Sequence, residues 1–306
     1  MKTPWMFCGA VAVMSATVGI DNAGAQDDRY RERIDTTVTL DRGGSLNLSV
    51  YSGHVNVTGV PGTKMRVKGV VDRGELRFDA HSTSVRMQVE PDGRHGGAAE
   101  LEISVPVGTR VQIDGYSAPY TVKGVKGEVK LESMSGSIEV SDAVGRTQLE
   151  SISGYIKADN IDGDLRVESV SGRVDVSNVN GDIEAESVSG HVWITGAKSK
   201  GVRAETVSSS ISYAGSIDPS GAYSFKSNSG RITLAVSANI GATVSLETFS
   251  GNVDSDFPVT LGAGTNSTGR DSRFEFKIGN GGARIILESF SGNIRIQRDT
   301  GRDNKE

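Results

Sequence analysis

Apolar and polar residues alternate along most of this chain in short runs, a pattern that favours β-strands over helices. Between residues 114 and 204 the pattern repeats about every eighteen residues. The repeats share a Glu-Ser-x-Ser-Gly motif, which begins at Glu132, Glu150, Glu168 and Glu186, with a looser copy from Asp114. A unit this short cannot bury its own apolar face, so the copies are expected to stack as coils of a β-solenoid.

Within each copy the apolar residues fall in fixed columns. One half of the coil has two such columns. The first consists of Ile138, Ile156, Val174 and Val192, and the second consists of Val140, Ala158, Val176 and Ile194. The other half has a column of Leu131, Leu149, Val167 and Ala185. The spacing of two within each half predicts two short strands per coil, joined by two turns.

Glycines recur every nine residues from Gly127 to Gly190, and we expect each one to supply a positive φ at a turn. Asn160 and Asn178 can adopt the same conformation. The predicted fold is therefore all-β, a single elongated parallel β-solenoid (β-helix) of two-strand coils, with its handedness left open.

The loosening of the repeat at both ends divides the chain into five segments. These are a signal peptide (1–25), irregular N-terminal coils or a cap (26–113), the regular β-solenoid (114–255), a hairpin insertion with the last coil (256–297) and a polar tail (298–306). A separate small β-sandwich is the alternative for residues 27–113. Terminal repeats of a solenoid have to cover its open ends, which favours irregular coils there.

The first residues of the chain predict export. Lys2 precedes an apolar run, and Ala23-Gly24-Ala25 provides the small-x-small pattern of a signal peptidase site, so we expect cleavage before Gln26. The single cysteine, Cys8, lies within this segment, so the mature chain has no disulfide or thiolate metal site. The expected location is periplasmic, cell-surface or secreted, and no transmembrane segment is expected after cleavage.

Composition and charge exclude some classes of partner and function. The chain has 39 glycines but only 7 prolines, and its net charge is −5, which gives no electrostatic basis for binding nucleic acid. Phosphate-binding loops and nucleophile elbows are absent from the sequence. We expect no catalytic residues, no cofactor and no metal.

Three segments in this order resemble the bacterial putative-adhesin family of unknown function. They are YSGHVNVTGVPGTKMRVKG from Tyr51, SVPVGTRVQIDG from Ser104, and the Glu-Ser-x-Ser-Gly coils that end in ESFSGNIRIQ. The resemblance implies a secreted or envelope β-solenoid acting as a binding or structural module. It supplies no catalytic residues.

The candidate binding surface combines stacked carboxylates with two outward aromatic residues. Its predicted members are Glu132, Glu150, Glu168, Glu186, Tyr155 and Trp193. Like charges in register repel one another, so we expect the acids to be solvated and partly paired with Lys130 and Arg166. The expected partner is a cell-surface or envelope component, either a glycan or a protein.

Two other patterns have structural explanations. A cluster of polar residues near one turn could bind calcium, but turns favour these residue types anyway; its members are Asn160, Asp162, Asp164, Asn178, Asn180 and Asp182. A repeated serine column, of which Ser153 is one member, indicates packing and turn hydrogen bonds.

The alternative function is a carbohydrate-active β-helix enzyme, for which Glu150 and Asp164 are one conceivable acid pair.

Overall fold

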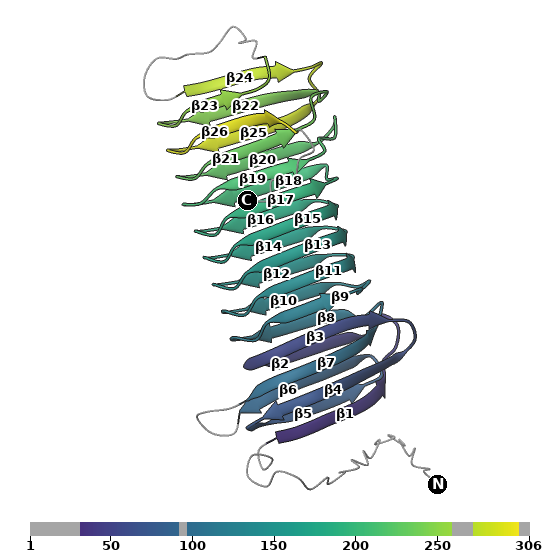
Figure 1. The fold of residues 1–306 in the computed structure, drawn as a ribbon. Helices are drawn as coiled ribbons and strands as arrows, with labels where there is room; N and C mark the ends of the chain where they lie inside the picture. The colour runs from purple at the N-terminus through teal and green to yellow at the C-terminus, as the bar shows by residue number, and fades with distance from the viewer. Residues whose placement is uncertain (1–30, 92–96, 259–271, 300–306) are drawn as a thin grey trace, which may run out of the picture.

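The computed structural model describes residues 31–91, 97–258 and 272–299, and it shows an elongated all-β stack of coils (Figure 1). The strands form two sheets of thirteen strands each. This confirms the predicted parallel β-solenoid. The expected signal peptide, residues 1–25, lies outside the described residues.

The first sheet holds the second strand of each coil, and its spatial order differs from the chain order at both ends. From one end to the other its strands are β1 (Arg31–Thr39), β4 (Lys64–Asp72), β7 (Ala98–Pro106), β3 (Ser52–Val60), β9 (Tyr120–Lys123), β11 (Ile138–Val144), β13 (Ile156–Asp162), β15 (Val174–Asn180), β17 (Val192–Ala197), β19 (Ile211–Gly215), β21 (Ile232–Val236), β26 (Ile294–Arg298) and β23 (Val253–Ser255).

The second sheet holds the first strand of each coil. In the same direction its strands are β5 (Gly74–His81), β6 (Ser84–Pro91), β2 (Ser45–Val50), β8 (Arg110–Gly115), β10 (Val129–Ser133), β12 (Thr147–Ser151), β14 (Leu165–Ser169), β16 (Ile183–Ser187), β18 (Gly201–Thr206), β20 (Ala222–Ser227), β25 (Ala283–Ser289), β22 (Ala242–Thr248) and β24 (Ser272–Ile278).

The predicted apolar columns are present and in register. Ile138 pairs with Ile156, which pairs with Val174, and that residue pairs with Val192; all four are at most 1% exposed. Leu131, Leu149, Val167 and Ala185 form a matching buried column in the second sheet. The core is thus a set of aliphatic ladders between the two sheets.

A residue with left-handed φ interrupts the alternation in β11, β13 and β15 and adds a further buried column. Asp142, Asn160 and Asn178 have φ of 55°, 55° and 54°. The inward alternation skips one residue there, so Ala143, and likewise Ile161 one coil later, also points into the core. The sequence prediction for Asn160 and Asn178 is confirmed.

The nine-residue glycine spacing has two different causes, which corrects the expectation of positive φ throughout. Gly145, Gly163 and Gly181 do have positive φ. Gly154 and Gly172 do not; a Cβ on either would collide with the carbonyl oxygen of the glycine one coil earlier, Gly136 and Gly154 respectively. These glycines are required because neighbouring coils approach closely at this turn, and not because of their backbone conformation.

Both ends of the stack contain a coil placed out of chain order. The β2–β3 coil lies between the β6–β7 and β8–β9 coils, and the β25–β26 coil lies between β20–β21 and β22–β23 (Figure 1). The apolar pattern determines which face of a strand is buried, but it does not specify which coil lies next to it. Chain order therefore fails as a guide at the ends.

Antiparallel strands finish the stack. β1 pairs with β4, β5 pairs with β6, and β24 pairs with β22, each in antiparallel register. The segment 256–282 was expected to form a hairpin of its own. Its described strand, β24, is the last strand of the second sheet, and the hairpin stays a prediction because residues 259–271 lie outside the described residues.

The close approach of glycines gives a stability prediction. Replacing Gly172 with Ala should lower the free energy of unfolding by about 2–3 kcal/mol, because the new Cβ forces two coil backbones apart. Gly108→Ala is the matched control, since its Cβ would have only one backbone atom within 4 Å, at 3.8 Å, and its change should be less than about 1 kcal/mol. Urea unfolding measures both. Equal midpoints for the two variants would refute the close-approach explanation.

Candidate functional site

A groove of about 1160 Å³ runs along the edge where the strands of the second sheet end and turn toward the first sheet. It is lined by the ends of β8, β10, β12, β14, β16, β18, β20, β22 and β25, and by the turns that follow all of them but β8. Each coil from β10 onward contributes the same three consecutive positions, those of the Glu, the Ser and the variable residue of Glu-Ser-x-Ser-Gly. The groove is thus a product of the repeat itself.

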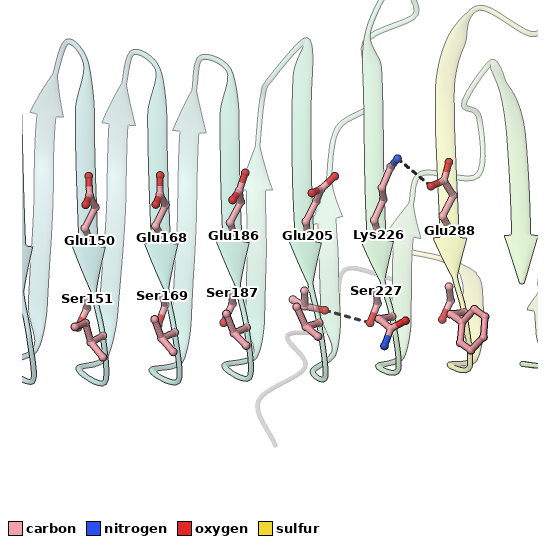
Figure 2. A pocket seen from close by; sticks show the side chains of 18 of the residues that line it. Glu150, Ser151, Glu168, Ser169, Glu186, Ser187, Glu205, Lys226, Ser227 and Glu288 are labelled. Atoms are coloured by element: carbon pink, nitrogen blue, oxygen red, sulfur yellow. Dashed lines mark hydrogen bonds and ion pairs between the residues drawn. The ribbon is translucent and has the colours of Figure 1, made fainter.

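The first position forms what we call the acidic row. Its side chains point the same way from successive strands (Figure 2). In spatial order its members are Asp114, Glu132, Glu150, Glu168, Glu186, Glu205, Lys226, Glu288 and Glu247. The four predicted glutamates are therefore brought together, in a longer row than the regular repeat indicated.

The second position is a buried row of hydroxyl groups that sequence reasoning missed. Ser151 and Ser187 each accept a hydrogen bond from the backbone N–H three residues later, of Gly154 at 2.8 Å and Gly190 at 2.9 Å. Both serines are 5% exposed. The Ser-x-x-Gly spacing was the available signal, because a serine three residues before a close-packed glycine is typical of a side chain that caps a turn.

The later serine of each motif was expected to make turn hydrogen bonds, and it does. Ser153 donates to the carbonyl oxygen of Met134 at 3.2 Å, and Ser171 donates to that of Ile152 at 3.2 Å. Each bond joins one coil to the preceding one. These serines therefore stabilise the stack.

The third position forms an exposed row, here called the turn-tip row. In spatial order it comprises Tyr51, Tyr116, Met134, Ile152, Val170, Val188, Val207, Asn228, Phe290 and Phe249. All the apolar members are at least 38% exposed. From Met134 onward, this row forms one side of the groove, and the acidic row forms the other.

The acidic row is only partly neutralised. Lys130 contacts Glu132 at 2.6 Å, Arg166 contacts Glu168 at 2.6 Å, and Lys226 contacts Glu288 at 2.9 Å. The predicted pairing with Lys130 and Arg166 is confirmed. Burial raises the pKa of the Glu150 carboxyl, and repulsion from Glu132 and Glu168 raises this pKa further.

The two predicted aromatic residues do not join the acidic row. Tyr155 and Trp193 line the first sheet and lie in coils separated by another coil. Within that middle coil, Asp175 accepts a hydrogen bond from the Tyr155 hydroxyl at 2.7 Å, and Arg173 lies 3.8 Å from the Trp193 ring centroid. The two rings therefore do not lie side by side, and each contacts a side chain of the middle coil.

Neither alternative site gains geometric support. Asn180 donates to Asp162 at 2.9 Å, and among the described residues no three His, Cys, Asp or Glu side chains group as metal ligands. Glu150 lines the groove, whereas Asp164 lines a different hollow. The two are offset by four residues along the strand direction, about 13 Å, more than the ~5–9.5 Å between glycosidase carboxyls.

Burial, together with repulsion within the acidic row, raises the pKa of Glu150 and gives a pH prediction. A carboxyl with a raised pKa in the folded state opposes folding while it is ionised, and the penalty disappears as pH falls below both pKa values. Glu150→Gln should therefore increase the free energy of unfolding at pH 7, and the gain should shrink toward zero below about pH 4. Urea unfolding at both pH values measures this difference.

Asp159→Asn is the control of opposite sign. A hydrogen bond from Ser177, at 2.6 Å, lowers the pKa of Asp159. Its ionised form therefore stabilises the fold above the unfolded pKa, and the variant should lose stability at pH 7 but not at low pH. A loss of stability at pH 7 in Glu150→Gln would contradict a repulsive row.

The comparisons with known proteins concern the whole stack. No curated protein matches the chain. Similar solved structures include a putative cell adhesion protein from Clostridium sporogenes, at 10% identity over 88% of this chain and 100% of that one, with a TM-score of 0.29. A putative adhesin from Bacteroides fragilis has 10% identity over 89% and 100%, with a TM-score of 0.38.

A putative adhesin from Parabacteroides distasonis has 10% identity over 87% of this chain and 97% of that one, with a TM-score of 0.29. Described residues include no helix long and apolar enough to cross a membrane. The family match covers residues 35–297, nearly the whole described stack, and its description is Toastrack DUF4097. The resemblance noted in the repeat segments is thereby confirmed, and the chain belongs to this family of unknown function.

Proposed function

We propose that the protein is an exported, non-catalytic binding module of the cell envelope or cell surface, and that the groove is where its partner binds. The observation that carries the proposal is the repetition of the same acidic, hydroxyl and turn-tip positions along the groove. A repeated surface suits an extended contact. Catalysis requires one asymmetric site in which particular groups differ from their neighbours.

The N-terminal sequence supports the proposed location. Lys2, the apolar run and the Ala23-Gly24-Ala25 site are typical of a signal peptide. A protein that leaves the cytoplasm meets cell-envelope polymers and proteins first. The proposed partner is therefore a large envelope or surface component, a glycan or a protein, which can span several coils at once.

A glycoside hydrolase would need a distinct acid pair, and the carboxylates of the groove do not provide one. Glu132, Glu150, Glu168 and Glu186 occupy equivalent positions, in register along parallel strands. The pair conceived from the sequence, Glu150 with Asp164, is divided between two hollows. Neither the groove carboxylates nor this pair therefore favours the carbohydrate-active alternative.

The test compares single and multiple substitutions in the acidic row. Each of Glu132→Gln, Glu150→Gln, Glu168→Gln and Glu186→Gln should weaken binding by at most about fivefold, the contribution of one exposed charge. The quadruple variant should weaken binding more than about tenfold, because contributions of separate sites approximately add. Binding is measured on intact bacterial cells and on a glycan array, with labelled mature protein.

The matched control removes the same number of charges elsewhere. A quadruple variant of Glu100, Glu102, Glu128 and Glu139 to Gln changes four exposed acids outside the groove. It should bind like the wild type. A hydrolysis screen on polysaccharides and peptidoglycan runs beside the titration, and turnover that one single substitution abolishes would establish an enzyme instead.

A further inference from the structure

The turn-tip row is an exposed apolar ladder that the fold itself does not require. Phe290 is 57% exposed, Tyr51 51% and Val207 49%. Asn228 occupies the same turn position, and its backbone N–H makes the same inter-coil hydrogen bond as the apolar members do. A polar residue is therefore compatible with this turn. The apolar identity of the other members needs an explanation outside folding.

The ladder is contiguous, which separates it from ordinary scattered surface apolar residues. Its ends are stacked ring pairs, Tyr51 on Tyr116 with centroids 5.2 Å apart and Phe249 on Phe290 with centroids 4.8 Å apart. Aliphatic side chains fill the coils between them, interrupted only by Asn228. Contiguous exposed apolar strips of this kind mark interaction surfaces.

The acidic row limits the chemistry of the partner. It runs parallel to the ladder on the other side of the groove, and Glu150 and Glu186 have no basic side chain within 4 Å among the described residues. A partner that covers the ladder brings its own surface against these carboxylates. Charge complementarity therefore demands a cationic stripe beside an apolar stripe.

The spacing of the coils selects the conformation of that partner. Coils repeat about every 4.8 Å along the groove, whereas same-side residues of a β-strand repeat about every 6.7 Å. The apolar stripe of an α-helix, with residues at i, i+3, i+4 and i+7, repeats on average about every 5.3 Å. A helix also satisfies its backbone hydrogen-bonding groups internally. An extended peptide would need partners for these groups, and the apolar side chains of the turn tips offer none.

We propose that this groove binds a basic amphipathic α-helix of another exported protein. The inference rests on the proposed binding function and names the partner's chemistry. The helix places its apolar stripe on the turn tips from Met134 to Val207 and its Lys or Arg stripe on Glu132 to Glu205. Five coils span about 19 Å, so roughly 13 helical residues make the contact.

A second copy of the chain and an anionic membrane fit the groove less well. Each copy has a net charge of −5 and would bring its own acidic row to the interface. Anionic lipid headgroups would face the same carboxylates and be repelled. Both remain distinguishable outcomes of the experiment.

The experiment uses the mature protein and a synthetic 16-residue helical peptide with a leucine stripe beside a lysine stripe. Ile152→Asn, Val170→Asn and Val188→Asn, combined in one variant, copy the residue found at Asn228. We expect at least tenfold weaker peptide binding by the triple variant, with an unchanged urea midpoint. A peptide with glutamate in place of lysine should not bind the wild type, and the groove quadruple Glu→Gln variant should lose affinity for the lysine peptide.

The control variant combines Val144→Asn and Val253→Asn, which are exposed valines outside the groove, and it should bind the peptide like the wild type. Peptide binding that is equal for the triple variant and the wild type would overturn the inference. So would a dimer in sedimentation that the triple variant dissociates, or binding of phosphatidylglycerol vesicles that it abolishes. If the peptide fails to bind while cells or glycans still bind through the acidic row, the helix is wrong and the proposed binding function stands.

Discussion

The in-register stacking of each coil on the next is the interaction on which the rest of the structure depends. Parallel pairing from β8 to β20 in the second sheet places equivalent residues above one another. A side chain that points outward or inward in one coil is therefore followed by one that points the same way in the next coil. The stacking is possible only because the backbones can touch at Gly154, Gly172 and Gly190, where a side-chain carbon would collide with the coil below. The ladder of buried serines then fixes the turn at the same place. Groove and core are two consequences of one register.

A stack of this kind has two exposed ends, and the chain protects both by the same device. At each end one coil is inserted out of chain order, and antiparallel strands lie beyond it. An inserted coil cannot detach without breaking its pairing on both sides, so the ends resist fraying more than a simple terminal coil would. The outermost strand β1 presents Arg31, Glu32 and Arg33 to solvent, and charged edges discourage end-to-end association of copies.

The sequence predicted the interior of the coils well because period and burial are coupled there. Ile156 and Val174 alternate with polar neighbours at a spacing of two, and only the inward face can accept them. The same pattern could not predict the ends, since a strand such as β25 buries the same face next to β20 or β22. Tyr155 and Trp193 both belong to the first sheet, but one further coil lies between their coils, so the two rings do not meet. The reason for Gly172 was also hidden, because a tight turn and a close approach both select glycine.

Some positions of each coil are fixed by the stacking and others are not, and only the second kind can indicate what the groove binds. Inward residues, glycines and the buried serines are dictated by stacking, so their identity carries no information about a partner. The turn tips are free of that constraint, as Asn228 demonstrates, yet nine of the ten positions in the row are apolar. Because each coil adds a similar small contribution, affinity for a partner should grow with the number of coils it spans. A small molecule would contact one or two coils and gain little, whereas an extended partner gains from every coil along the groove.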